Sequence, residues 1–147
     1  MKYMRLSILT ILTIASLQLS ACAPAAAPEE EVKSVRLEPI AGTDLNNVIL
    51  TADAAKRLDI KMVTVHEEEI NGVRQIVIPY DAVLYEANGN TWVYVNIEPL
   101  TFVRQAIVID HIAGDQAFLS EGPAPESAVV TLGAAELFGS ESEFEEE

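Results

Sequence analysis

The chain has 147 residues and a net charge of −14, from 9 Lys and Arg against 23 Asp and Glu. This balance argues against nucleic acid as a partner, because phosphate binding requires a basic surface that releases counterions. Half of the residues are hydrophobic and only one is cysteine. These proportions exclude a wholly disordered polyanion, an intramolecular disulfide and a Cys-rich zinc site.

The first 21 residues have the layout of a secretion signal. Lys2 and Arg5 precede an apolar run from Leu6 to about Leu19, and this order is typical of secretory signals. The run closes with Leu19-Ser20-Ala21-Cys22, which resembles the bacterial lipobox, where the cysteine is acylated and the chain is cut just before it. The resemblance implies a lipoprotein of the cell envelope, facing the periplasm or the cell exterior. The alternative is an ordinary secretory signal in which Cys22 is incidental.

Cleavage before Cys22 leaves a chain of 126 residues, enough for about one domain. Because Lys2 and Arg5 leave with the signal, the net charge becomes −16. Acyl chains on Cys22 would hold this chain on a membrane, since each buried methylene group contributes about 0.8 kcal/mol.

A flexible tether is predicted for residues 22–45 and a disordered acidic tail for residues 139–147. The tether starts with Ala and Pro from Ala23 to Pro28, continues with Glu29 to Glu31, and shows no apolar periodicity. The tail carries five glutamates and one aromatic residue, and blocks of like charge usually remain solvated. Residues 46–138 are left for the folded domain.

A short helix is predicted near the start of this domain. Val48 to Leu50 is a β-rich run, and Thr51 suits the N-cap of a helix of about two turns that contains Asp53, Ala54 and Leu58.

Two strands joined by a polar bend follow. Residues 60–65 are β-branched and partly alternating, and Glu67 to Glu69 end this strand at a bend that Asn71-Gly72 completes. Residues 73–78 form the second strand, and Pro79 ends it because proline has no N–H to donate.

A β-hairpin is the clearest structural signal. Residues 81–85 and 91–97 flank the loop Glu86 to Asn90, which contains Asn88-Gly89, and Asn-Gly between two such runs favours a tight turn.

The rest of the domain is predicted to be β-structure that ends in one helical turn. Short strands separated by turn signals indicate an all-β fold, a small antiparallel β-roll or barrel-like domain with one or two short helices. The expected segments are a strand over 101–110, a turn at Gly114-Asp115, a strand over 116–119, a rigid loop over 121–125, a strand over 128–132 and a helical turn over 134–138.

No constellation typical of catalysis or metal binding is evident. His66 and His111 each lack a second His or Cys at ligand spacing, so surface histidines are the simpler interpretation. Asp81, Glu86 and Glu98 could pair as acid and base only if one carboxyl group were desolvated. We therefore expect no enzyme, no cofactor and no metal site.

Aromatic residues gather on the strands after the hairpin loop. Trp92 and Tyr94 are two residues apart and share one face of a strand. Such a set is more often core than a ligand platform, but a face left uncovered is a candidate docking surface. The candidate docking residues are Trp92, Tyr94, Phe102 and Arg104.

Four segments, in order, resemble the membrane-proximal part of periplasmic adaptor proteins, also called membrane fusion proteins, of resistance-nodulation-division (RND) efflux pumps. Each segment is short, and the resemblance lies in the ordered set. The segments are Ile78-Pro79-Tyr80-Asp81-Ala82-Val83, Gly89-Asn90-Thr91-Trp92-Val93-Tyr94-Val95, Phe102-Val103-Arg104-Gln105-Ala106-Ile107 and Ala128-Val129-Val130-Thr131-Leu132-Gly133-Ala134.

A fifth segment, residues 48–60, resembles the short helix and strand near the adaptor N-terminus. Together the matches cover about 90 residues and imply a free-standing membrane-proximal domain on a lipid tether, joined around Glu67 to Gly72, where the adaptors insert their other domains. Two departures stand out. Pro123 to Glu126 replaces a glycine turn of the family, and no helical-hairpin arm is present.

The resemblance implies a non-enzymatic envelope lipoprotein that docks on an RND transporter or on a full-length adaptor. Two alternatives stay open: a lipoprotein that binds cations or a small ligand, and a structural module of the envelope.

Overall fold

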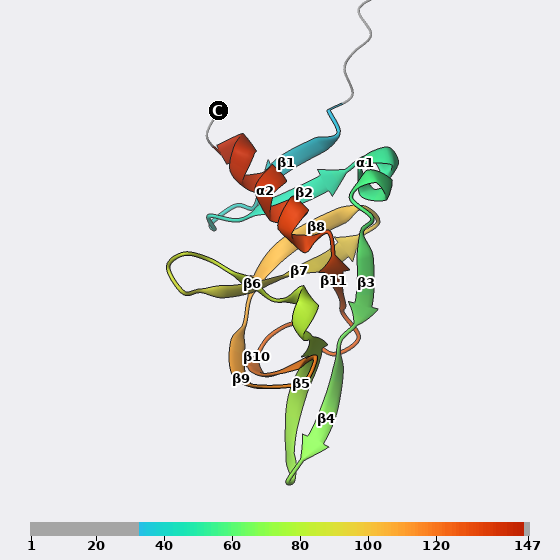
Figure 1. The fold of residues 1–147 in the computed structure, drawn as a ribbon. Coiled ribbons are helices and arrows are strands. Elements are labelled where there is room, and N and C mark those ends of the chain that lie inside the picture. The colour runs from blue at the N-terminus through green and yellow to red at the C-terminus, as the bar shows by residue number, and fades with distance from the viewer. Residues whose placement is uncertain (1–32, 146–147) are drawn as a thin grey trace, which may run out of the picture. The chain divides into compact units, whose positions relative to one another are not determined.

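The computed structural model describes residues 33–145, with side chains to residue 142, and Figure 1 shows its strands and helices. The predicted signal sequence, Cys22 and the first part of the predicted tether lie outside the described residues. Among the described residues, no helix is long and apolar enough to cross a bilayer.

Two antiparallel sheets make up the domain, which confirms the predicted all-β class. The seven-stranded sheet has the order β1 (Val35–Pro39), β2 (Asn46–Leu50), β8 (Thr101–Ala106), β7 (Thr91–Glu98), β11 (Ala128–Leu132) and β3 (Lys61–Thr64), and β6 (Leu84–Tyr85) also pairs with β7. The four-stranded sheet has the order β4 (His66–Ile70), β5 (Val73–Pro79), β10 (Gln116–Glu121) and β9 (Val108–Ala113).

The chain passes from one sheet to the other at buried residues. Val65 lies between β3 and β4 and is fully buried, and its N–H donates to the carbonyl oxygen of Ser127 at 2.8 Å. Ile107 lies between β8 and β9, and its N–H donates to the carbonyl oxygen of Thr91 at 3.0 Å. The strand predicted over 101–110 is therefore broken at Ile107, because the two halves belong to different sheets.

The short helix predicted near the start of the domain is confirmed. The helix α1 (Ala52–Arg57) begins after Thr51, whose Oγ1 accepts a hydrogen bond from the Ala54 N–H at 3.2 Å. Ala54 is buried, so the cap places one side of this short helix against the core.

The turns predicted at the two Asn-Gly pairs are both present. In the β6–β7 hairpin, Leu84 pairs with Trp92 across the loop 86–90, and Gly89 has the positive φ of 90° that glycine adopts easily. The strand before this loop is short, because residues 80–82 form the 3-10 turn η1 (Tyr80–Ala82).

At the other turn, Asn71 and Gly72 have φ values of 54° and 80°, as a two-residue hairpin requires. The prediction that Glu67 to Glu69 form a bend is wrong. These residues lie inside β4, paired with residues 74–76 of β5, and the turn is confined to Asn71-Gly72.

The predicted tether extends too far into the domain. Residues 35–39 form β1, which pairs with β2, and Val35 and Leu37 pack against buried residues of the core. The alternation Val35-Arg36-Leu37-Glu38 is the period-two signal of an edge strand.

The predicted disordered tail over 139–147 is also wrong for the described part of that segment. The helix α2 (Ala134–Glu145) continues well beyond the predicted helical turn. Figure 1 shows α2 lying across the β1–β2–β8 side of the seven-stranded sheet. Glu141 is only 1% exposed, so this residue belongs to the folded core.

The domain has two apolar cores, one on each side of the seven-stranded sheet. The inter-sheet core consists of Val65, Ile78, Ala82, Val93, Val95, Ile107, Ala117, Leu119 and Val129. The helix-side core consists of Val48, Leu50, Ala54, Tyr94, Phe102, Val130, Ala134 and Leu137.

Candidate functional site

Three of the four predicted docking residues lie in the interior. Tyr94 is fully buried, Phe102 is 1% exposed and Arg104 is 9% exposed. The predicted docking surface is therefore wrong for these three, because α2 covers the face of the sheet on which they lie. Their burial supports the other interpretation of the aromatic residues, that they belong to the core. Trp92 remains partly exposed.

Arg104 is the centre of a buried ion cluster. Its Nη1 donates to Oε1 of Glu86 at 2.8 Å. Its Nε lies 2.9 Å from Oε2 of Glu141, although the N–H is not aligned for a hydrogen bond. The same Glu141 oxygen accepts a hydrogen bond from the Tyr94 hydroxyl at 2.5 Å. The cluster thus links β8, the hairpin loop and α2.

Two aromatic rings flank the guanidinium group of Arg104. Its Cζ atom lies 5.4 Å from the ring centre of Trp92 and 5.3 Å from that of Phe138, distances at which cation–π attraction is significant. The charge is therefore compensated by carboxylates and by ring faces at the same time.

The Glu86 carboxylate is held in its charged form. Burial alone would raise its pKa, but the Trp92 indole, the Asn88 amide and the Arg104 charge together lower the pKa below its ordinary value. The Asn88 Nδ2 donates to Glu86 Oε2 at 3.2 Å. These contacts fix the hairpin loop beside α2, so we assign the cluster a structural role.

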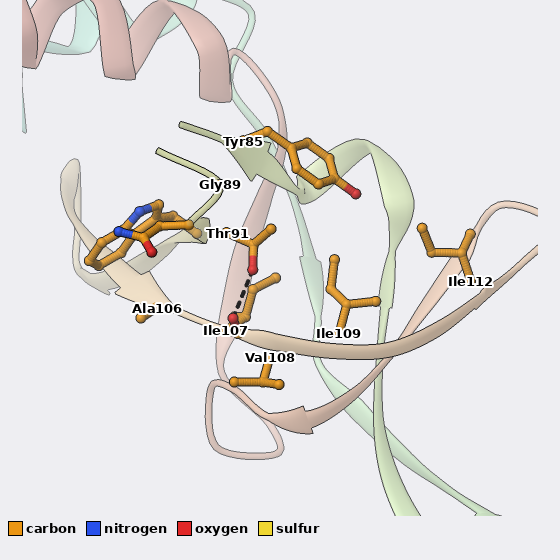
Figure 2. A pocket seen from close by; sticks show the side chains of 10 residues that line it. Tyr85, Gly89, Thr91, Ala106, Ile107, Val108, Ile109 and Ile112 are labelled. Carbon is orange, nitrogen blue, oxygen red and sulfur yellow. Dashed lines mark hydrogen bonds between the residues drawn. The ribbon is translucent and has the colours of Figure 1, made fainter. Parts of the chain in front are cut away.

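An open groove lies between the β6–β7 hairpin and β9. Its volume is about 720 Å³, and Figure 2 shows the Tyr85 side chain on one side with Ile109 and Ile112 rising toward it from β9. The lining residues are Tyr85, Gly89, Asn90, Thr91, Trp92, Ala106, Ile107, Val108, Ile109 and Ile112.

The groove is apolar and its backbone is fixed. Tyr85 is 54% and Ile112 46% exposed, which is high for large apolar side chains that face one groove. At its floor, Thr91 Oγ1 donates to the carbonyl oxygen of Ile107 at 2.8 Å (Figure 2). This bond fixes the start of β7 to the residue at which β8 passes into β9.

A second tyrosine extends the apolar rim. The rings of Tyr80 and Tyr85 are tilted, with centres 6.4 Å apart, and Tyr80 is also exposed. The neighbouring Tyr80 hydroxyl, and then partial burial, raise the pKa of Tyr85 above its ordinary value of 10.0. The Tyr85 ring is therefore uncharged at neutral pH and suits an apolar contact.

Polar contacts border β9. Asp110 Oδ2 lies 2.9 Å from His111 Nδ1 and accepts a hydrogen bond from Gln75 at 3.1 Å. The hydrogen bonds from His111 and then from Gln75 lower the pKa of Asp110. The His111 ring also stacks on Phe118, with ring centres 4.5 Å apart.

The structure places the remaining candidates for chemistry apart from one another. His66 and His111 are exposed, and each pairs with a carboxylate on its own strand. Asp81 and Glu98 are exposed, so neither is the desolvated carboxyl group that acid–base pairing requires. Within residues 33–145, no group of three or more His, Cys, Asp or Glu is placed to hold a metal ion.

Comparison with known proteins gives no relative. No family model, curated protein or solved structure matches the chain.

Sequence reasoning missed the groove residues on β9. The sequence did contain a signal for them, because residues 106–109 form a continuous apolar run. A strand that buries only one face needs apolar residues at alternate positions only. The surplus apolar positions are those that line the groove.

Proposed function

We propose that the protein is a non-enzymatic lipoprotein of the cell envelope whose β domain docks on an RND transporter or on its periplasmic adaptor. The lipobox at Cys22 supports the membrane anchor. The ordered segments between Ile78 and Leu137 that resemble the membrane-proximal part of adaptors support this class of partner.

The groove beside the β6–β7 hairpin is the observation that carries the docking proposal. It gathers exposed Tyr85 and Ile112 with Ile109 on one surface, with Tyr80 at the rim. Tyrosine is enriched among residues that dominate protein interfaces, since it offers a large contact area with few rotatable bonds. An apolar loop or strand end of the partner would fill this groove.

A small apolar ligand is the second candidate occupant. The groove volume of about 720 Å³ lies within the range of small-ligand sites. Its open form favours a protein partner, because pockets for small ligands usually enclose most of the ligand surface.

The test uses the full chain, expressed with its signal sequence and a C-terminal tag in envelope membranes. A photo-crosslinking amino acid replaces Ile112 in the groove, and in the matched control it replaces Val73, which is 60% exposed on β5. We expect the Ile112 position to crosslink to an RND transporter or adaptor, identified by mass spectrometry, and the Val73 position not to do so.

Two further variants separate docking from folding. Tyr85→Asp should abolish the crosslink, since a charge in the groove opposes an apolar contact, whereas Val73→Asp should leave it intact. The docking proposal fails if both positions crosslink equally, or if the only occupant of the groove is a small molecule that co-purifies with the protein.

A further inference from the structure

Four strands of the described domain lie at the end of a sheet and have a neighbouring strand on one side only. They are β1 and β3 in the seven-stranded sheet, and β4 and β9 in the four-stranded sheet. A free edge is able to pair with another chain, and proteins usually oppose such pairing with charged side chains, proline or a bulge. The four edges of this domain differ in that protection.

Three of the four edges are protected. β1 carries Arg36 and Glu38 and ends at Pro39. β4 contains three successive glutamates, Glu67 to Glu69. β9 carries Asp110 and has shifts in its pairing register with β10. Each of these features opposes the addition of another strand.

The edge of β3 is open and apolar on both faces. Its one charged residue is Lys61, at the first position, whereas Met62 and Val63 are 45% and 41% exposed. Met62 pairs with Val130 of the helix-side core, and Val63 pairs with Val129 of the inter-sheet core. Because directly paired residues share a face of the sheet, both cores continue to an exposed side chain at this edge.

The backbone of β3 also presents hydrogen-bonding groups at this edge. The Val65 N–H donates to the Ser127 carbonyl oxygen at 2.8 Å, and the Val65 carbonyl oxygen accepts from the Glu126 N–H at 3.0 Å, so both groups point toward the β11 side. Backbone groups alternate in direction along a strand. Those of Met62 and Thr64 therefore point away from β11, toward the open edge.

We infer that β3 pairs with β3 of a second copy of this chain, antiparallel and about a two-fold axis at Val63. In this register Met62 of each copy lies opposite Thr64 of the other, and the outward groups of each such pair exchange both N–H···O hydrogen bonds. Val63 lies opposite Val63 of the second copy, so the exposed apolar side chains cover one another. Such an interface uses the same patch on both copies and closes at a dimer.

The charges beside β3 favour a second copy as the occupant. Lys61 lies before Val63, and the glutamates of β4 follow it (Figure 1). Lys61 and Val63 share a face by alternation, and Glu67 is on the inter-sheet side as well, because it pairs with Ile76, which packs against that core. Antiparallel pairing thus brings Lys61 of each copy diagonally across from Glu67 of the other. A parallel arrangement would instead set the glutamates of the two copies side by side.

Contacts within one copy compete only weakly with this charge pairing. Lys61 lies 3.2 Å from Asp59, and Glu67 lies 4.0 Å from Arg74. Both pairs are exposed, and exposed pairs contribute little. The dimer itself is weak in free solution, because β3 has only four residues and short edges limit pairing. Confinement of both copies to one membrane would raise their effective concentration, so the strength of the dimer, though not its geometry, rests on the anchor proposed at Cys22.

The experiment expresses the full chain in envelope membranes with one introduced cysteine and treats the membranes with a mild oxidant. Val63→Cys tests the two-fold axis, because opposite residues of a non-hydrogen-bonded antiparallel pair have Cα atoms about 4.5 Å apart, within the range of a disulfide. Thr64→Cys is the matched control on the same edge, where the two Cα atoms would be about 8 Å apart, beyond that range. Val73→Cys, exposed on β5, measures random collision. We expect a disulfide-linked dimer from Val63→Cys and little from the other two.

Two changes in the Val63→Cys chain separate the parts of the inference. Lys61→Glu should lower the crosslinked fraction about threefold, since two cross-strand charge pairs are lost, and adding Glu67→Lys should restore it. Met62→Pro should lower it as well, because proline removes an N–H at the open edge. Pairing with β11 should survive, since proline is tolerated on an edge strand where the N–H faces solvent, and chemical denaturation checks that the domain remains folded.

Other outcomes overturn defined parts of the inference. Equal crosslinking from Val63→Cys and Val73→Cys, or a Val63→Cys chain that stays monomeric, would overturn the dimer, and a stronger dimer from Thr64→Cys would overturn the axis at Val63. A Val63→Cys disulfide to a different protein would show that the second copy is not the occupant. A dimer of the chain without an introduced cysteine would mean that Cys22 carries a free thiol. That result would overturn the anchor alone, and the same comparison in a Cys22→Ser chain would then decide the pairing of β3.

Discussion

The two faces of β7 lie against different kinds of interior. Val93 and Val95 face the inter-sheet core, which contains only apolar side chains. Trp92 and Tyr94 lie on the other face, where Arg104 and Glu141 form the buried ion cluster under α2. The first interior requires volume and apolar character, whereas the second also requires that each buried charge meets its partner.

This difference decides which substitutions each side tolerates. A truncated side chain in the inter-sheet core leaves a cavity, and the loss of stability grows with the volume removed. A truncated side chain in the ion cluster leaves a buried charge without its partner, and that loss does not depend on volume.

The largest effect is expected for Arg104→Leu. The substitution leaves the carboxylate of Glu141, which is 1% exposed, without a cation, and removal of one partner of a buried pair costs about 3 to 5 kcal/mol. Chemical denaturation should measure the loss. The double variant Arg104→Leu with Glu141→Leu should lose less than the single variant, because the more deeply buried carboxylate is then also removed and only Glu86, whose side chain is 19% exposed, is left without Arg104. If the single and double variants lose the same amount, charge pairing does not distinguish the two interiors.

The next effect is expected for Leu119→Ala in the inter-sheet core. Leu119 is 1% exposed, and the cavity left by such a truncation costs about 3 kcal/mol. The matched control is Leu132→Ala, at a position that is 45% exposed, where the loss should stay below about 0.5 kcal/mol. Equal losses at the two positions would mean that the sheets do not enclose a packed core.

Acid should affect the two sides differently. The pKa of Glu86 is lowered in the folded state from its ordinary value of 4.5, so its contribution is complete above that value and is lost as the pH falls through the lowered pKa. Glu86→Gln should therefore reduce stability at neutral pH and make the dependence of stability on pH flatter as the pH falls below 4.5.

Unfolding measured across this range checks the prediction. The control variant Glu69→Gln changes an exposed carboxylate on β4 and should leave the pH profile close to that of the natural chain. A profile unaffected by Glu86→Gln would show that the cluster does not depend on this carboxylate.

The inter-sheet core and the local turns were predictable from the sequence, whereas the ion cluster was not. Alternation along β7, the Asn71-Gly72 turn and the Thr51 cap act over a few residues, so the pattern alone locates them. Glu141 meets Tyr94 across 47 positions of the chain. Nothing near Glu141 in the sequence distinguishes it from the other four glutamates of the segment, and the five glutamates therefore predicted a disordered tail.

The groove was unpredictable for a similar reason. Its two sides come from the β6–β7 hairpin and from β9, and they meet because the chain passes between sheets at Ile107. The sequence shows the hairpin and the apolar run 106–109 separately. Where β8 ends and β9 begins depends on the tertiary hydrogen bond from Ile107 to Thr91, which no local pattern encodes.

The smallest effect is expected for Thr51→Ala, which tests whether the stability of the helix-side core also depends on the N-cap of α1. The substitution removes the acceptor of the 3.2 Å bond from the Ala54 N–H, and loss of an N-cap costs about 1 kcal/mol. Because Ala54 packs into the helix-side core, the loss should appear in global unfolding and not as fraying of α1 alone.

Thr51→Ser is the matched control, since serine keeps the hydroxyl acceptor and caps helices at least as well as threonine. Its stability should stay within about 0.5 kcal/mol of the natural chain. If both variants lose stability equally, the methyl group of Thr51 matters more than its hydroxyl. The helix side would then be held at this point by packing, as the inter-sheet core is, and the contrast between the two interiors would be confined to the ion cluster.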